Sequence, residues 1–284
     1  MDRGEDIVER ISWRIGGRLI EPRFPMVMGI LNVTPDSFLA ASRVDPNEAL
    51  REAEAMLNAG ASILDLGGSS TRPGAQEIPI EEELERVIPA IGSIHREFPE
   101  ALISIDTYRS EVAKAAVEAG AGMVNDIGAG LLDPAMLETV AKLKVPYVLM
   151  HMQGTPRTMQ KDPQYGDVVK EVVLFLSQRV NAARAAGIAD VIVDPGFGFG
   201  KNTDHNFQLL KGIASIRMLG VPVLIGLSRK RMINEVLGTT PAQALNGTSI
   251  LNTIALLNGA HILRVHDVKE AVECVKLIER YRSI

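Results

Sequence analysis

The sequence has a single cysteine, Cys274, among its 284 residues. One cysteine excludes a disulfide within the chain and argues against a cysteine-based zinc site. No apolar run reaches the length of a membrane-spanning helix. The charged start of the chain, residues 1–10, also has no apolar region of the kind that secretory signals carry. We therefore expect a cytoplasmic enzyme or binding protein.

The sequence also has no excess of positive charge. The net charge is −5 and the sequence contains no basic run, which argues against a nucleic-acid-binding surface. At 46% apolar and 23% charged residues, the composition is typical of a globular protein with a substantial core. Because no low-complexity linker or break in composition divides the chain, we expect one domain over residues 1–284.

Short apolar runs alternate with helical segments along most of the chain. A hairpin is predicted at residues 11–20, where Gly16-Gly17 supplies a two-residue turn and Trp13 and Ile15 share a face that could plug an apolar opening. The predicted strands that follow are 26–31, 62–66, 102–105, 122–124, 147–150, 191–193, 221–225 and 262–263. The predicted helices are 47–58, 81–98 with Pro89 as a candidate break, 109–119, 134–142, 167–186, 205–215, 229–237, 242–257 and 268–281.

Eight strand–helix units predict a (β/α)8 TIM barrel from about residue 25 to residue 284, since such barrels need about 250 residues. A doubly wound open sheet is the alternative. Such a sheet usually carries a glycine-rich dinucleotide turn after its first strand. Here the glycine-rich segment 196–200 follows the sixth predicted strand, so the barrel is favoured.

Polar side chains gather at the carboxyl ends of the predicted strands. In a barrel the loops that leave these ends meet at one mouth, where the active site lies. Each residue taken alone has a structural explanation; Asp106, for example, could cap the following helix. Together they predict one site. The residues are Asn32, Thr71, Arg72, Asp106, Asn125, His151, Asp194, Ser228, Lys230, Arg264 and His266.

The charges in this set are of two kinds. The cations suit a phosphate-bearing ligand. Asp106 and Asp194 suit a flat heterocycle with adjacent N–H donors, although a carboxylate pair for general acid–base chemistry is the competing role. Asp194 also begins a tight loop with alternating glycines, in which Phe197 and Phe199 could form apolar walls or belong to the core.

Eight motifs occur in the order and spacing found in dihydropteroate synthases, and the sequence resembles that family from residue 29 to residue 267. They are GILNVTPDSF (29–38), GGSSTRPG (67–74), SIDT (104–107), NDI (125–127), LMHMQG (149–154), DPGFGFG (194–200), SRK (228–230) and RVHD (264–267). Each motif is weak by itself, whereas the ordered set is specific.

The resemblance implies a transferase of folate biosynthesis, a target of sulfonamides, that joins 6-hydroxymethyl-7,8-dihydropterin pyrophosphate to p-aminobenzoate. It implies a homodimer and Mg2+ as the cofactor. It further implies that Asp106, Lys230 and Arg264 act in catalysis. The implied ligand contacts are the pterin ring for Asp106, Asn125, Asp194 and Lys230; Mg2+ for Asn32; phosphate for Arg264 and His266; p-aminobenzoate for Thr71, Arg72, Pro73 and Phe199; and substrate for Met150 and Gly226.

The sequence departs from the family at three places. Residues 39–43 replace an acidic, glycine-rich turn in the first loop, Ser69 stands where glutamate is usual, and Arg231 stands where serine is common. Two other functions remain open. A pterin-binding methyltransferase domain would keep the two pterin acids without the phosphate pair, and a non-catalytic paralogue would bind pterin without reacting it.

Overall fold

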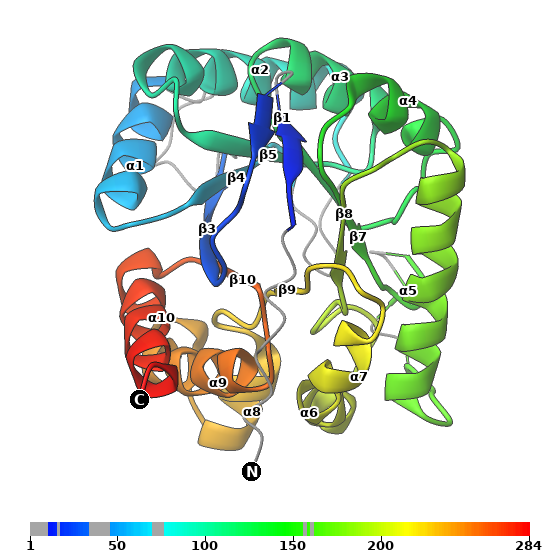
Figure 1. Ribbon diagram of the computed structural model, residues 1–284, viewed down its shortest axis with the longest axis vertical. Coiled ribbons are helices and arrows are strands. Elements are labelled where there is room, and N and C mark those ends of the chain that lie inside the picture. The colour runs from blue at the N-terminus through cyan, green and yellow to red at the C-terminus, as the bar shows by residue number, and fades with distance from the viewer. Residues whose placement is uncertain (1–10, 16–17, 34–45, 70–76, 156–157, 160–161) are drawn as a thin grey trace.

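Short runs of β-branched and other apolar residues form eight parallel strands in the computed structural model (Figure 1). The structure describes residues 11–15, 18–33, 46–69, 77–155, 158–159 and 162–284. The (β/α)8 barrel expected from the sequence is confirmed. Its strands are β3 (Met26–Asn32), β4 (Ile63–Gly67), β5 (Leu102–Asp106), β6 (Met123–Asp126), β7 (Tyr147–Met150), β8 (Val191–Asp194), β9 (Leu224–Ile225) and β10 (Ile262–Val265).

The strands pair in the order β8-β7-β6-β5-β4-β3-β10-β9, all in parallel. The circle closes between β8 and β9 through an isolated bridge that joins Val193 to Val223. There the backbone N–H of Val193 donates to the carbonyl oxygen of Pro222 at 2.9 Å. Pro222 has no N–H with which to bond a further carbonyl oxygen of β8, so pairing along this seam is short.

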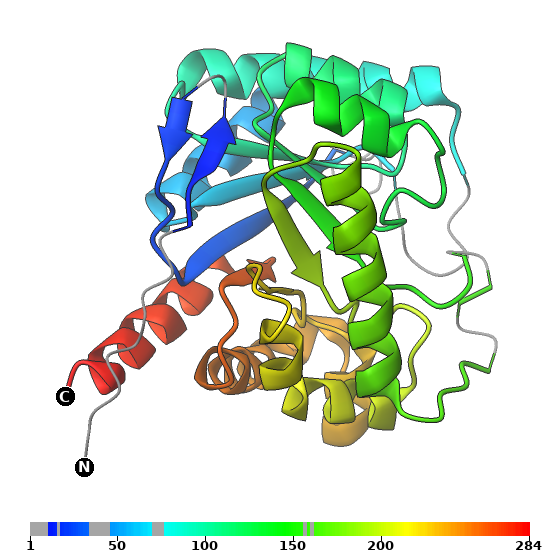
Figure 2. The same ribbon diagram turned by 45° about the vertical axis from the view of Figure 1, so that its right-hand side comes forward.

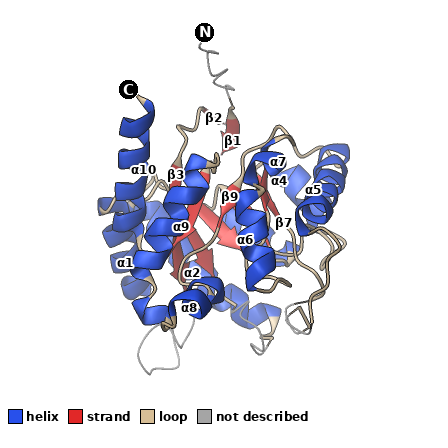
Figure 3. Ribbon diagram, turned by 90° about the horizontal axis from the view of Figure 1, so that it is seen from below, coloured by secondary structure: helices blue, strands red, loops and turns tan. Residues whose placement is uncertain are grey.

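Helices surround the barrel strands in the view of Figure 1, and from the side α9 (Leu245–Leu257) and α6 (Thr203–Lys211) lie in front of the strands (Figure 3). They bury the main core between outward-facing strand residues such as Leu64 and Leu66 and helix residues such as Ile91. No described helix is long and apolar enough to cross a membrane. The helices are α1 (Pro46–Asn58), α2 (Ile80–Glu97), α3 (Ser110–Glu118), α4 (Met136–Leu143), α5 (Val168–Ala185), α6 (Thr203–Lys211), α7 (Ile213–Arg217), α8 (Arg231–Leu237), a 3-10 turn η1 (Pro241–Gln243), α9 (Leu245–Leu257) and α10 (Val268–Arg282).

Two helices differ from the prediction. Pro89 does not interrupt α2, because it lies on the exposed face, where water can bond the carbonyl group that the missing N–H leaves free. The helix predicted at residues 205–215 is instead two helices, α6 and α7, that meet at Gly212. A Cβ at Gly212 would lie 2.7 Å from the side chain of Val169, so the absence of a side chain there lets α5 approach closely.

The amino-terminal hairpin covers the end of the barrel at which the parallel strands begin, which is called its bottom here (Figures 1 and 2). It consists of β1 (Trp13–Ile15) and β2 (Arg18–Ile20), and its predicted Gly16-Gly17 turn lies outside the described residues. Trp13 is 1% exposed and packs in a second cluster with inward-facing residues such as Met28 and Ile192. The plug expected from Trp13 is thus present, and the barrel interior can open only at the carboxyl ends of the strands.

Candidate active site

The second layer of the barrel interior is polar where the bottom layer is apolar. Alternate residues of each strand face inward, so Asp65 follows Ile63, Asn125 follows Met123 and Arg264 follows Ile262 in the inward positions. The predicted site residues that the structure describes all lie at this end of the barrel: Asn32, Asp106, Asn125, Met150, Asp194, Phe199, Gly226, Lys230, Arg264 and His266. Residues 39–43 and the predicted Thr71, Arg72 and Pro73 lie outside the described residues.

The guanidinium of Arg264 lies between two carboxylates at the centre of this layer. Its Nε donates to Oδ2 of Asp65 and its Nη2 donates to Oδ2 of Asp106, each at 2.6 Å. Arg264 is only 21% exposed, and burial alone would lower its pKa. The two carboxylates outweigh that effect and raise the pKa, so Arg264 is a permanent cation here.

The surroundings of Asp106 raise its pKa toward neutral pH. Burial raises its pKa to about 7; the guanidinium of Arg264 opposes the rise, and the carboxylate of Asp65 adds to it. Among the described residues, Oδ1 of Asp106 has no hydrogen-bond partner although it is buried. A buried acceptor without a partner is costly in a folded protein. This atom is therefore available to a donor on a bound molecule.

Asp194 and Lys230 form the opposite wall. Burial raises the pKa of Asp194. The ammonium of Lys230 opposes this rise, and so does a hydrogen bond from the N–H of Gly196 at 2.7 Å. Burial lowers the pKa of Lys230 to about 8. Its ammonium donates to the carbonyl oxygen of Phe197 and lies 4.9 Å from the centre of the Phe199 ring. A cation, an acid and an aromatic face therefore meet in one place.

Gly226 lies between Lys230 and Arg264. A Cβ at Gly226 would lie 3.8 Å from Nζ of Lys230 and 3.9 Å from Cβ of Arg264. Asp106, Lys230 and Arg264, the three residues to which the sequence assigns catalysis, are thus gathered in one cup. The competing interpretation treats Asp106 and Asp194 as an acid–base pair. In the structure each acid has a cation as its neighbour, Arg264 for Asp106 and Lys230 for Asp194.

A buried lysine fixes the loop that carries Phe199. Lys201 is 3% exposed, and its ammonium contacts Nδ1 of His151 at 2.9 Å and the carbonyl oxygens of Gly196 and Phe199 at 2.9 and 3.0 Å. Burial lowers the pKa of His151 to about 3, and the nearby ammonium adds to this effect. Burial also lowers the pKa of Lys201 well below its usual value. His151 is therefore neutral, and its contact with Lys201 gives it a structural role beneath the loop rather than a place in the cup.

The phosphate side predicted from the sequence lies at the edge of the mouth. His266 is exposed, and its Nδ1 lies 2.9 Å from Oγ of Ser228, which also accepts from the His266 backbone N–H at 3.2 Å. Next to this pair, the guanidinium of Arg229 binds Asp267 at 2.6 and 2.9 Å. The loop after β9 is thereby tied to the end of β10.

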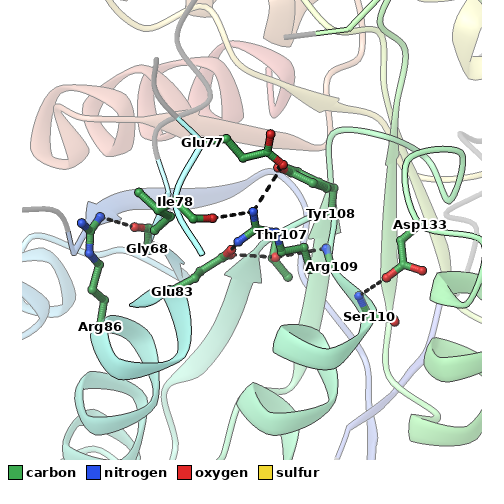
Figure 4. A network of polar contacts seen from close by, with 10 residues as sticks. All are labelled: Gly68, Glu77, Ile78, Glu83, Arg86, Thr107, Tyr108, Arg109, Ser110 and Asp133. Carbon is green, nitrogen blue, oxygen red and sulfur yellow. Dashed lines mark hydrogen bonds and ion pairs between the residues drawn. The ribbon is translucent and has the colours of Figure 1, made fainter. Parts of the chain in front are cut away.

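Two arginine side chains hold the backbone on either side of residues 70–76 (Figure 4). Arg86 in α2 donates Nη1 to the carbonyl oxygen of Gly68 at 2.8 Å. On the other side, Arg109 donates Nη2 to the carbonyl oxygen of Ile78 at 2.7 Å. Both flanks of the segment that contains the predicted p-aminobenzoate residues are therefore fixed to the barrel.

Glu83 connects this anchor to the end of β5. It is 1% exposed, accepts from Oγ1 of Thr107 at 2.8 Å and forms an ion pair with Arg109 at 2.8 Å. Burial raises the pKa of Glu83, while the bonds from Thr107 and Arg109 lower it. Since Thr107 follows Asp106, the same buried acid joins the cup to the flank of residues 70–76.

Asp65, Lys201 and Glu83 are buried charged residues of this region that the sequence argument does not select. Asp65 lies inside an apolar strand rather than at its end, and a charged residue in a fully buried strand is the signal that could have revealed it. Lys201 directly follows the glycine-rich loop, and its role becomes visible only when that loop folds over it. Glu83 is indistinguishable in the sequence from the neighbouring surface acids of α2.

The described residues contain no group of three or more His, Cys, Asp or Glu side chains that could hold a metal ion. Asn32, the predicted Mg2+ contact, lies at the end of β3. A Cβ at Gly67 would lie 3.8 Å from Oδ1 of Asn32 and 3.9 Å from Oδ2 of Asp106, so the amide oxygen faces the mouth. One neutral oxygen donor fits a Mg2+ ion that is held mainly by substrate phosphates and water.

Comparison with known proteins agrees with this geometry. The sequence pattern of the family described as "Pterin binding enzyme" matches residues 28–266. The dihydropteroate synthase of Escherichia coli (strain K12) is 46% identical over 266 residues, which are 93% of this chain and 94% of that protein. The chain belongs to the dihydropteroate synthase family. A second relative, the dihydropteroate synthase of Haemophilus influenzae, is 45% identical over 89% of this chain and 92% of that protein.

Solved structures of the family have the same fold. The Yersinia pestis dihydropteroate synthase in a sulfonamide complex matches with a TM-score of 0.90 at 42% identity, covering 96% of this chain and 100% of that one. The Xanthomonas albilineans enzyme in complex with 7,8-dihydropteroate matches with a TM-score of 0.87 at 42% identity and the same coverage. The function expected from the sequence, dihydropteroate synthesis by a transferase, is confirmed at this level.

Proposed function

We propose that this chain condenses 6-hydroxymethyl-7,8-dihydropterin pyrophosphate with p-aminobenzoate in the cup formed by Asp106, Asn125, Asp194, Lys230 and Arg264. The observation that carries the proposal is the guanidinium of Arg264 between two buried carboxylates, above a plugged and apolar floor. The cup is closed below by the apolar cluster, while the side chains of Arg264 and Asp106 above it remain 21% and 11% exposed. A flat ring bound there would meet both acceptors and cations.

The pterin ring would lie between the acids. Its adjacent N–H groups form a donor edge, and Oδ1 of Asp106 is an acceptor that no described residue uses. Met150, which is 4% exposed, supplies an apolar lining, and Gly226 leaves room beside Lys230. In the resting site these groups are already in position, which lowers the cost of ordering them on binding.

The reaction breaks the carbon–oxygen bond of the pterin methylene group, leaving positive charge on the pterin and negative charge on pyrophosphate. The carboxylates of Asp106 and Asp194 stabilise the first, and His266 with the outer part of Arg264 faces the second. When bound, Mg2+ supplies Lewis-acid stabilisation of the leaving pyrophosphate, and Asn32 would hold it.

The nucleophile needs placement more than activation. An arylamine is neutral near pH 7, so its nitrogen can form the new bond to the pterin methylene carbon without a general base and then lose one proton to water. Phe199 would border its ring, and Thr71, Arg72 and Pro73 complete the proposed p-aminobenzoate side. This division of labour agrees with a cup in which each acid already has a cationic neighbour and neither is paired with a histidine.

The direct test is pyrophosphate release from the pterin pyrophosphate, with p-aminobenzoate and Mg2+ present. Release that requires both p-aminobenzoate and Mg2+, with dihydropteroate as product, is the expected result. Pterin binding without release would favour the non-catalytic paralogue. Methyl transfer from a folate cofactor without release would favour the methyltransferase.

We further propose that the chain forms a homodimer through α9 and α10. These helices pack against each other and present a group of large exposed apolar side chains. The group consists of Ile250, Ile254, Leu257, Leu277 and Tyr281, which are 37–71% exposed. Sedimentation should show a dimer at micromolar concentration. A monomer there would overturn this assignment.

We propose the cytoplasm as the place of the reaction. The described helices include no membrane span, and the relatives compared above are bacterial. Fractionation of cells that express the chain should recover its activity with the cytoplasmic markers. Recovery with the periplasmic or membrane fraction would contradict the proposal.

A further inference from the structure

Asp65 is the most deeply buried acid of the cup. It occupies the middle of β4, is 0% exposed and faces inward directly above Ile63 of the apolar bottom layer. Asp106 and Asp194, by contrast, lie at strand ends, where a ligand can reach them. Asp65 therefore lies beneath the residues that would touch the substrate rather than among them.

The carboxylate of Asp65 binds two of those residues with a single oxygen. Its Oδ2 accepts from Nε of Arg264 at 2.6 Å and from Nδ2 of Asn125 at 3.0 Å. Its Oδ1 has no partner among the described residues. Strands β4, β6 and β10 thus meet at one atom, although Asp65 and Arg264 are 199 residues apart in the sequence.

This contact decides how both partners face the cup. A carboxylate can only accept hydrogen bonds, so Asn125 must direct its NH2 group toward Asp65 and its carbonyl oxygen away from it. Arg264 is fixed through Nε to Asp65 and through Nη2 to Asp106. Its Nη1, which bonds to none of the described residues, is left to face a ligand.

Stability alone does not account for an acid at this position. Burying a carboxylate is expensive, and a well-packed apolar residue in place of a buried ion pair often costs nothing or stabilises the fold. Asp65 also brings a second negative charge to a single guanidinium that Asp106 already binds. What Asp65 contributes is the orientation of its two neighbours, because a negatively charged acceptor at this position holds both the amide of Asn125 and the guanidinium of Arg264.

We propose that Asp65 is a positioning residue, whose carboxylate holds the guanidinium of Arg264 and the amide of Asn125 in the orientation in which both meet the pterin substrate. The proposal rests on the function proposed above, since it concerns the same cup. Asp65 itself does not touch the substrate. Its removal therefore acts only through its two partners, and this can be measured.

The test is a double-mutant cycle of Asp65→Asn with Arg264→Lys, read out as kcat/KM for the pterin pyrophosphate. Asp65→Asn should lower kcat/KM by at least about tenfold in the otherwise unchanged enzyme, because the neutral amide loses the charge-assisted bond to the guanidinium and can also turn its NH2 group toward it. In the Arg264→Lys background the same change should cost less than about threefold. The KM for p-aminobenzoate should change by less than about twofold in Asp65→Asn.

Asp126→Asn is the matched control. Asp126 is also buried, at 1% exposure, but it faces away from the cup and accepts from Tyr147, Gly128 and Gly130. This variant should lose thermal stability while keeping its KM for the pterin. If Asp65→Asn does not fold, Asp65→Glu provides the same cycle, because it keeps the charge but displaces it by one methylene group.

Three results would overturn the proposal. They are unchanged pterin kinetics in the Asp65 variant, an equal loss in both Arg264 backgrounds, and an equal rise in pterin KM in Asp126→Asn. Failure of the proposed function would look different, as an unaltered chain that forms no dihydropteroate. In that case pterin affinity by calorimetry replaces kcat/KM in the same cycle and still decides the role of Asp65.

Discussion

At the scale of single residues, the site is a set of buried charges whose pKa values have moved toward each other. Burial raises the pKa of Asp106 to about 7 and lowers that of Lys230 to about 8. Groups with such values change charge close to neutral pH. Substrate binding should therefore depend on pH within a narrow interval.

Pterin binding is expected to be tightest between about pH 7 and pH 8. As the pH falls through about 7, Asp106 takes up a proton, loses its negative charge and presents an O–H donor to the donor edge of the ring; as it rises through about 8, Lys230 loses its charge. The charged groups that act on the pKa of Asp106 are Arg264, which lowers it, and the acids Asp65, Glu83 and, from outside the cup, Asp126, which raise it. Calorimetry across this range measures the profile. Asp106→Asn keeps its oxygen on Arg264 and turns an NH2 group toward the ring, so it should weaken binding at every pH, and the binding that remains should lack the acidic limb. A variant that kept the limb would assign it to another group.

Asp194→Asn should abolish pterin binding. The N–H of Gly196 already occupies Oδ1 of Asp194, so an amide would keep its oxygen there and turn its NH2 group toward the donor edge of the ring. Asp190→Asn is the control, because Asp190 precedes β8 at the other end of the barrel and binds the backbone N–H of Arg14. Calorimetry should show unchanged affinity in the control. Unchanged affinity in Asp194→Asn would remove it from the site.

At the scale of elements, the hairpin β1–β2 is a stopper for the barrel. The ring of Trp13 lies 5.7 Å from that of Phe24 in an edge-to-face arrangement, and Phe24 in turn contacts His261 beside β10. This stopper lies at the opposite end from the site. It contributes to stability and touches none of the site residues.

Trp13→Ala should lower the free energy of unfolding by about 3–5 kcal/mol, since it leaves a cavity in a packed cluster. Leu19→Ala, in the same hairpin at 70% exposure, should have almost no effect. Chemical denaturation measures both values. The KM for each substrate should remain that of the unchanged chain, and a raised pterin KM in Trp13→Ala would show that the stopper shapes the site.

The sequence predicts elements better than contacts. Periodic apolar runs and glycine or proline breaks locate the strands, and the expected mouth follows from where those strands end. Asp65 escapes this reasoning because its partners, Asn125 and Arg264, lie 60 and 199 residues further along the chain. Lys201 escapes it because its acceptors are backbone carbonyl oxygens, which leave no trace in the sequence.

At the scale of the whole molecule, the barrel separates two tasks. Its outer core, between strands and helices, is apolar and continuous, whereas the interior is apolar only below and charged above. The exposed apolar face on α9 and α10 lies outside both. Stability, chemistry and association thus occupy different surfaces, so substitutions on one should leave the others largely intact.

The barrel closes between β8 and β9 by short pairing, and site residues lie at or after the ends of both strands. Asp194 ends one bordering strand, and Gly226 follows the other, with Lys230 four residues beyond. A pterin bound by residues that follow both strands would link β8 to β9. The amide proton of Val193, which closes the seam, should then exchange with solvent more slowly when pterin is bound. Equal exchange rates with and without pterin would mean that bound pterin does not stabilise the pairing of β8 with β9.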